Sequence, residues 1–412
     1  MGAHSRVLTN ARLFAAVDES VIDDAAVWME AGKIRYAGPA AQLPADAPDA
    51  QAPDAQIEDV AGKFVMPGMT EGHAHLSFAD SSPFAIGDVS VEEATITAVN
   101  NAKLMLRSGF TSAVSFGSTH SIDVALRAAI ANGKIDGPRL LAAGQDLGAT
   151  ASNVDSPGAL SQIADGPWAL RRAVREQRKL GVDIVKVFID GEAINPTNPP
   201  GELAFTDEEV NAVVDEAKRR RLRVACHARS AAAVKQAVRA GVELIGHANY
   251  VDDEAVDMLA GVNDQVFISP AIAWEINYLE KCGTLGIDRQ TVIDQGYQAE
   301  LEASQVAIEK LRAADVKLVI GGDYGISIAP HGTYAQDIEF FVDYFDMRPG
   351  EALLCATRNG GLSADPSGGR GTLVEGSLAD LLVVDGDPLA DVRVLQNHAK
   401  ISVYKGGQVV TH

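Results

Sequence analysis

Residues 223–249 read RVACHARSAAAVKQAVRAGVELIGHAN, and this stretch decides the fold class. A short apolar run ends at Cys226, an alanine-rich stretch with helical character covers 230–240, and a second apolar run covers 242–245. Short apolar strands that alternate with helices are typical of βα units in a parallel sheet. Each run is followed directly or nearly so by a histidine, His227 or His247. The stretch therefore predicts two neighbouring parallel strands that both end at a histidine.

The same alternation extends from about residue 67 to residue 370. One intervening helix is predicted over 206–220, because Thr206 can cap it and Glu209 completes a capping box. Eight βα units predict an α/β protein with a closed (β/α)8 TIM barrel over residues 68–370. The eight candidate strands are Phe64–Met66, Thr111–Phe116, Arg139–Ala143, Asp183–Ile189, Arg223–Cys226, Val242–Ile245, Gln265–Ser269 and Lys317–Ile320.

Both ends of the chain have a different texture. Short alternating runs separated by glycines occupy 1–67, and similar runs return over 371–412. Such runs are typical of antiparallel strands joined by turns. We therefore expect one small β-sandwich domain that is built from both termini.

Composition restricts the partners and the compartment. The 35 Lys and Arg residues against 56 Asp and Glu residues give a formal charge of −21, which argues against nucleic acid or an anionic membrane surface as a partner. Three cysteines make no disulfide framework, and no apolar run approaches the roughly 20 residues of a membrane span. We expect a cytoplasmic protein in a reducing compartment that acts on a small molecule.

Chemically active side chains gather at the predicted strand ends. In a (β/α)8 barrel these ends form one mouth, where catalytic residues lie. His73 and His75 have a spacing of two and point to the same side of an extended backbone. A lone histidine is more often structural, and an aspartate after two glycines is more often a turn residue. The joint arrival of these residues at one mouth favours a metal site; they are His73, His75, Lys186, His227, His247 and Asp323.

Lys186 stands inside an otherwise apolar strand. A lysine that faces a barrel interior pays a large desolvation penalty unless it is paired or neutral. Carbamylation by carbon dioxide would convert it into a carboxylate that can bridge two cations. The alternative is a lysine on the outer face of the strand that reaches water.

These motifs resemble the metal-dependent amidohydrolase superfamily over nearly the whole chain. The resemblance rests on Met66-Pro67-Gly68 followed by His73-x-His75, on Lys186, His227, His247 and Asp323, and on the tail from Gly376 to Leu389. The lysine and the phrase AGVELIGH look like the branch with Xaa-Pro dipeptidases, ochratoxin-type amidases and imidazolonepropionase-like proteins. Relatives often assemble as homo-oligomers, which the resemblance implies here.

The resemblance implies a binuclear site. His73, His75 and Asp323 would hold the first ion, His227 and His247 the second, and carboxylated Lys186 with a hydroxide would bridge them. Zinc is the expected metal, with cobalt or manganese as alternatives. The implied reaction is hydrolysis of an amide, peptide, carbamate or urea C–N bond, with Asp323 as general base and then general acid.

Other functions stay open at this stage. They are a mononuclear deaminase or cyclic-imide hydrolase, a lactone or phosphoester hydrolase on the same site, and a metal-binding scaffold without activity. Lys186 argues against a mononuclear site, which needs no bridge.

Substrate contacts do not carry over from the resemblance, because the loops after the second and third strands depart from the family pattern. Four residues are candidates for substrate binding: His120, Arg229, Tyr250 and His331. The first three are candidates from their positions, and His331 because it stands in a Pro-His-Gly phrase similar to that of relatives, where it could also support the site from behind its ligands. Arg229 can pair with a substrate carboxylate, and its alternative is an internal salt bridge. Tyr250 and His120 have packing or structural roles as alternatives.

Overall fold

The computed structural model describes residues 5–48, 55–82, 85–155, 158–193, 195 and 198–411. The chain divides into two compact units. The terminal unit comprises Met1–Glu71, Leu104–Ser112 and Tyr334–His412, and the central unit comprises Gly72–Lys103 and Ala113–Thr333. Each is described by itself below.

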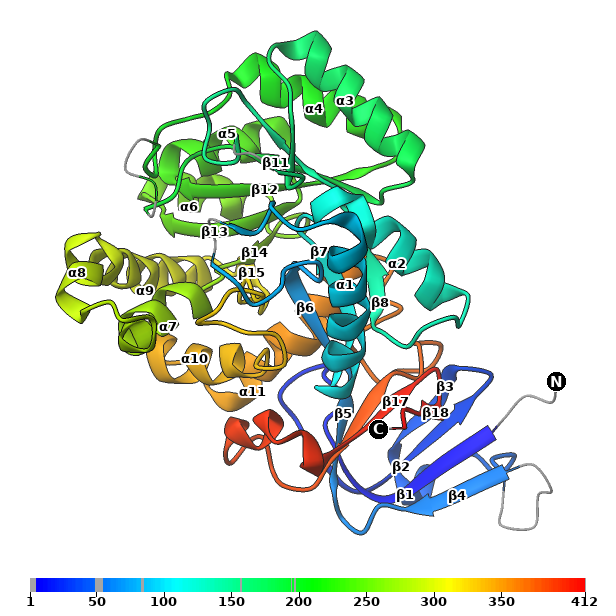
Figure 1. Ribbon diagram of the computed structural model, residues 1–412. Helices are drawn as coiled ribbons and strands as arrows, with labels where there is room; N and C mark the ends of the chain where they lie inside the picture. The colour runs from blue at the N-terminus through cyan, green and yellow to red at the C-terminus, as the bar shows by residue number, and fades with distance from the viewer. Residues whose placement is uncertain are drawn as a thin grey trace. The chain divides into compact units, whose positions relative to one another are not determined.

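The terminal unit is built around one sheet to which both ends of the chain contribute (Figure 1). Its strand order is β18-β17-β16-β5-β1-β2-β3, and β4 pairs with β1. Buried side chains such as Leu8, Val27 and Leu381 pack into one apolar core. The strands are β1 (Ser5–Leu13), β2 (Ile22–Glu30), β3 (Lys33–Pro39), β4 (Ala55–Asp59), β5 (Phe64–Pro67), β16 (Leu381–Val384), β17 (Ile401–Lys405) and β18 (Gln408–Val409). Three helices of this unit are α10 (Gln336–Phe345), α11 (Pro349–Leu354) and α12 (Gly360–Ala364).

One predicted strand is wrong. Phe64–Met66 was expected to open the barrel, but β5 pairs with β1 and with β16, where Phe64 lies opposite Val384. The first strand of the central series is instead β6 (Met69–Ala74). The apolar signal of the sequence ends with β5, because the buried strand β6 contains Thr70, Glu71 and His73. The hydrogen-bond partner changes at Gly68, whose N–H still donates to Asp380 while that of Met69 donates to Gly109.

The remaining strands form two sheets, whose neighbours run β6-β7-β8 and β10-β9-β11-β12-β13-β14-β15. Consecutive strands of the second sheet pair in parallel, for example β11 with β12 and β12 with β13. The strands are β7 (Phe110–Ser115), β8 (Arg139–Leu141), β9 (Asp146–Gly148), β10 (Ser161–Ile163), β11 (Ile184–Phe188), β12 (Arg223–Ser230), β13 (Leu244–Tyr250), β14 (Phe267–Ser269) and β15 (Lys317–Leu318). The other seven predicted strands each overlap one of these, which confirms the α/β class with parallel strands.

Two backbone hydrogen bonds join the ends of these sheets. The Ile184 N–H donates to the Ala142 carbonyl at 3.1 Å, which links the β8 end to β11. The Gly72 N–H donates to the Ile320 carbonyl at 2.9 Å, which links β6 to the segment after β15. The first and last strands of the series therefore lie side by side.

Helices separate most of the strands. They are α1 (Val91–Arg107), α2 (Ile122–Ala131), α3 (Pro167–Leu180), α4 (Asp207–Arg219), α5 (Ala231–Ala240), α6 (Asp253–Ala260), α7 (Ala273–Lys281), α8 (Arg289–Asp294) and α9 (Tyr297–Ala313). The predicted capping box of α4 is present, since Thr206 accepts from the Glu209 N–H and Glu209 accepts from the Thr206 N–H. Among the described residues, no helix is both long and apolar enough to cross a membrane.

Helices α3 and α4 lie side by side and are joined by ion pairs (Figure 1). The Glu216 carboxylate is 3 % exposed and accepts from Arg175 at 2.9 Å and from Arg220 at 2.8 Å. The Arg175 hydrogen bond is the main cause that lowers the pKa of Glu216 to about 2. This pair therefore couples the two helices through charge as well as packing.

We expect Glu216→Gln to destabilise the protein by about 1 kcal/mol at pH 7, because both arginines are half exposed and solvent screens the pair. The folded pKa lies below the unfolded value, so the contribution is complete above about pH 4.5 and is lost as pH falls toward 2. The difference in free energy of unfolding between wild type and the variant should be smaller at pH 4 than at pH 7. Urea unfolding at both pH values measures it. Glu309→Gln, at an exposed position on α9, is the control, and an equal effect of both variants would contradict the prediction.

Candidate metal centre

Side chains from several strand ends of the central unit meet in one cavity of about 770 Å³. His73 lies near the end of β6, while His227 and His247 belong to β12 and β13. The parallel register brings them to one level, since Phe188 lies opposite His227 and Ala228 lies opposite His247. The six predicted metal ligands all line this cavity; they are His73, His75, Lys186, His227, His247 and Asp323.

The four imidazoles form one cluster. The ring centroids of His73 and His247 lie 5.1 Å apart, those of His227 and His247 4.3 Å, and those of His73 and His75 5.3 Å. Burial lowers the pKa of His73, His227 and His247 well below the usual histidine value. These imidazoles are therefore neutral at pH 7, which is the form that binds metal ions.

Stacked phenylalanines hold the rings in place. Phe116 stacks on His73 with centroids 4.1 Å apart, and Phe188 stacks on His227 at 3.8 Å. Phe78 stacks on His75 at 4.4 Å. A ring that is packed on one face loses little further entropy when its nitrogen binds a ligand.

The tautomer of His75 points to a cation. Its Nδ1 lies 3.0 Å from the Gly117 carbonyl oxygen, which can only accept, so Nδ1 carries the proton. Its Nε2 then faces the Asp323 Oδ1 at 3.2 Å. Two acceptors at this distance repel each other unless a proton or a metal ion lies between them, which fits a metal site.

Asp323 is held as a carboxylate. Burial alone would raise its pKa, but His73, His75 and Lys186 together keep the pKa of Asp323 well below its usual range. Its Oδ1 lies 3.9 Å from His73 Nε2. An ionised carboxylate in this position can bind a cation and can accept a proton.

Lys186 faces the cavity, so the alternative of an outward lysine is wrong. Lys186 is 2 % exposed, and its Nζ donates to the Phe116 carbonyl at 3.3 Å. The Nζ also lies 4.8 Å from the centroid of the Phe116 ring. The amine is thus buried among the histidine ligands rather than in solvent.

The backbone is strained where two of these residues stand. His247 has a φ of 77° and Asp323 a φ of 58°, a region that non-glycine residues rarely adopt. Such outliers cluster at functional sites. Nearby, a Cβ on Gly246 would lie 2.7 Å from His73, so this glycine allows the close approach of β13 to the imidazole.

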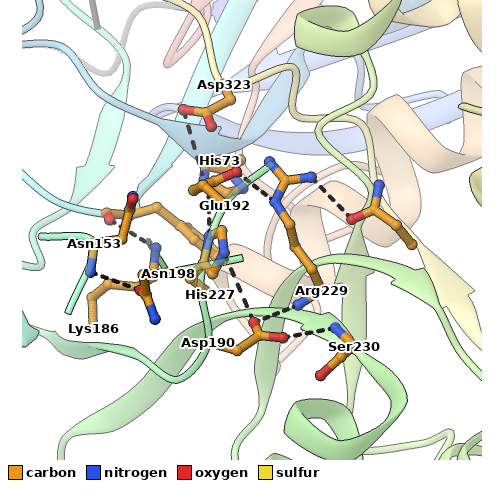
Figure 2. Close-up of polar contacts among 12 residues, drawn as sticks. His73, Asn153, Lys186, Asp190, Glu192, Asn198, His227, Arg229, Ser230 and Asp323 are labelled. Carbon is orange, nitrogen blue, oxygen red and sulfur yellow. Dashed lines mark hydrogen bonds and ion pairs between the residues drawn. The ribbon is translucent and has the colours of Figure 1, made fainter. Parts of the chain in front are cut away.

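Arg229 lines the cavity but does not offer a free charge. Its Nε lies 2.6 Å from Glu192 (Figure 2). One terminal nitrogen lies 2.9 Å from Glu275 and 2.7 Å from Glu300. The same nitrogen donates to Asn249 at 3.1 Å. Three carboxylates already surround the guanidinium, so the structure favours the internal salt bridge over the predicted contact with a substrate carboxylate.

The other three predicted substrate contacts lie away from the cavity among the described residues. The His120 ring contacts the Val89 carbonyl at 2.9 Å, and the His331 ring contacts the Phe78 carbonyl at 3.1 Å. Tyr250 ends β13 half-buried outside the cavity lining. The carbonyl that His331 contacts belongs to Phe78, whose ring stacks on His75, so His331 lies behind the cavity wall.

The sequence did not single out Glu192 and Asp146, two of the acidic residues that line the cavity. Glu192 follows the β11 end, and burial raises its pKa to about 7. Asp146 opens β9, and burial raises its pKa to about 6. Both lie a few residues after predicted strands. A search for carboxylates as well as histidines in the loops after those strands would have found them.

The donor atoms fall into two groups that share one imidazole. His73, His247 and Asp323 each offer an atom within 4.8 Å of the others, and so do Glu192, His227 and His247. Within the described residues these groups match the chemistry of zinc and similar divalent ions, which prefer imidazole and carboxylate ligands. The grouping differs from the expected one, because Glu192 joins the second group.

Comparison with known proteins shows which family this chain belongs to. The model of the Amidohydrolase family matches residues 64–410, and the chain belongs to this family. It is 28% identical over 377 residues to ochratoxinase of Aspergillus niger, covering 84% of this chain and 75% of that protein. It is 26% identical over 404 residues to imidazolonepropionase of Maricaulis maris, covering 94% of each.

Solved structures give the same assignment. A Xaa-Pro dipeptidase with methionine bound in its active site matches with a TM-score of 0.85 and 25% identity, over 99% of this chain and 100% of that one. The structure of Aspergillus niger ochratoxinase matches with a TM-score of 0.88 and 24% identity, over 99% and 96% of the two chains. The chain is therefore a hydrolase of a family that includes enzymes acting on C–N bonds.

We expect Arg229→Met to destabilise the metal-free protein by about 3–5 kcal/mol, because it leaves buried carboxylates without their counter-charge. The loss of stability should become smaller toward pH 5, because protonation of the buried carboxylates removes their uncompensated charge. Urea unfolding at pH 7 and at pH 5 measures it. Arg239→Met removes a half-exposed arginine as the control, and a loss of stability similar for both variants would contradict the assignment.

Proposed function

We propose that this chain is a binuclear metal-dependent amidohydrolase that cleaves an amide-type C–N bond, in an amide, peptide, carbamate or urea. Its catalytic unit would be a closed (β/α)8 barrel with a β-sandwich built from both termini. Two hydrogen bonds support the closure: that at Ile184 joins β8 to β11 of the other sheet, and that at Gly72 joins β6 to the segment after β15. One observation carries the function: two groups of metal-binding atoms share His247 within one buried cavity.

The metal ions would be held by the six residues that line the cavity, in the grouping that the family resemblance implies. His73, His75 and Asp323 would hold the first ion, and His227 and His247 the second. Lys186, carboxylated by carbon dioxide, would bridge the two; its burial among neutral imidazoles supports this role, because a carboxylate bound by two cations removes the penalty of a buried amine. When bound, two divalent ions, most readily zinc, would lower the pKa of a shared water and polarise the scissile carbonyl.

Asp323 would move the proton. It is ionised at neutral pH, so it can accept the proton of the attacking water as the new C–O bond forms. The same proton would then pass to the nitrogen as the C–N bond breaks, which gives a free amine and, from an amide or peptide, a carboxylic acid. Its position supports this role, because its Oδ1 lies 3.2 Å from His75 Nε2 and 3.9 Å from His73 Nε2, and strained backbone such as that at Asp323 is common at functional sites.

The relatives indicate where to look for the substrate. Ochratoxinase, imidazolonepropionase and Xaa-Pro dipeptidase have names that refer to different substrates, so the family relation alone selects a bond type and no compound. The cavity of about 770 Å³ suits a small molecule. Trp274 lines it and stacks on Tyr278 with centroids 5.2 Å apart, which supports an aromatic or apolar acyl group.

Metal content tests the binuclear site. Protein purified without chelators is expected to contain about two divalent ions per chain by elemental mass spectrometry, and Lys186→Ala is expected to fall well below that number. A short carboxylic acid should restore part of the loss by occupying the vacated bridge. Lys179→Ala, at an exposed position on α3, is the control. About one ion in both wild type and Lys186→Ala would instead favour a mononuclear deaminase or cyclic-imide hydrolase.

Turnover tests the roles of the side chains. His73→Ala and Asp323→Asn are each expected to lower kcat/KM by at least about 10³-fold on N-acyl amino acids, aryl amides, carbamates or ureas, with an unchanged circular dichroism spectrum. Asp323→Asn removes the proton acceptor without a change in side-chain size. Unchanged turnover in either variant would overturn the assignment.

A further inference from the structure

We propose that Glu192 is an additional protein ligand of the second metal ion, beside His227, His247 and the bridging Lys186. The inference rests on the proposed binuclear function and extends it to a residue outside the expected ligand set. Glu192 stands four residues after β11, in a segment that crosses the cavity wall, and its carboxylate lines the cavity.

The distances fit a ligand. The Glu192 Oε1 lies 3.4 Å from the His227 Nδ1, and both groups lie within 4.8 Å of a donor atom of His247. A usual N–H···O hydrogen bond is about 2.7–3.2 Å long, so this contact is longer than one. Two atoms bound to one tetrahedral zinc at about 2.0–2.2 Å lie roughly 3.3–3.6 Å apart. The spacing therefore matches two neighbouring ligands of one ion.

The two carboxylate oxygens of Glu192 have different surroundings. Oε2 lies 2.6 Å from the Arg229 Nε, while Oε1 is directed toward His227 (Figure 2). Arg229 is itself held by Glu275 and Glu300. A ligating carboxylate that is oriented by a second hydrogen-bonding group is the usual arrangement at metal sites. Arg229 thus acts as a positioning residue that leaves Oε1 for the ion.

The charges of this cluster argue against a purely structural role. A single guanidinium, that of Arg229, faces the three carboxyl groups of Glu192, Glu275 and Glu300, and all four side chains are buried or nearly so. If all three carboxyl groups are ionised, Arg229 alone cannot offset their charge, and an uncompensated buried charge is costly. A divalent ion at Oε1 supplies the missing positive charge.

Metal affinity tests the proposal without reference to turnover. Metal-free wild type, Glu192→Gln and Glu202→Gln are titrated with Zn²⁺ by calorimetry, and with Co²⁺ by visible absorption. Glu192→Gln is expected to bind the second ion at least about tenfold more weakly, with the first ion unaffected and a changed Co²⁺ spectrum. Glu202→Gln makes the same chemical change at an exposed position of the same segment and is expected to match wild type.

The outcomes separate this inference from the proposed function. If wild type binds fewer than two ions, the proposed function fails and this inference fails with it. If wild type binds two and Glu192→Gln binds both with unchanged affinity and spectrum, only the role of Glu192 is overturned. Should Glu192→Gln fail to fold, Glu192→Asp keeps the charge beside Arg229 but shortens the reach. A second-ion affinity of Glu192→Asp equal to wild type would also overturn the proposal.

Discussion

The parallel pairing of β11, β12 and β13 is the constraint on which the site depends. Hydrogen bonds in register place His227 beside Phe188 and His247 beside Ala228, so that functional residues from distant parts of the chain reach the same level. Parallel strands present their carboxyl ends at one edge, and side chains there face the same space. Without this register the two imidazoles of β12 and β13 would not lie 4.3 Å apart.

The site concentrates charge in a buried volume, and neighbouring groups compensate it. Neutral imidazoles surround an ionised Asp323, while Lys186 brings an amine to the same cavity. Beside them, Arg229 gathers three glutamates from three different segments. Such groups are costly to bury alone, so each depends on the correct placement of the others. The stability of the cavity wall and the arrangement of the candidate metal ligands therefore depend on the same buried groups.

Most of the fold could be predicted from the sequence because its signals are local. Thr206 and Glu209 form a capping box within one turn, and the apolar runs with their Gly and His ends are continuous segments. The first strand was assigned wrongly because the apolar segment at Phe64 pairs within the terminal sheet, while the buried strand β6 contains Glu71 and His73 and gives no apolar signal. The hydrophobic period of a segment does not specify which strand it pairs with, because pairing is decided only in the folded chain.

The sequence by itself determined the family, the βα alternation of the parallel α/β unit and the six residues that line the cavity as candidate ligands. These follow from residue types at strand ends, which the chain order records directly. Only the tertiary structure decided the neighbours of each side chain. It surrounded Arg229 with carboxylates, directed His120 and His331 to backbone carbonyls, and brought Glu192 to His227. These contacts join residues that are distant in sequence or lie in irregular loops, where no periodic pattern specifies the direction of a side chain.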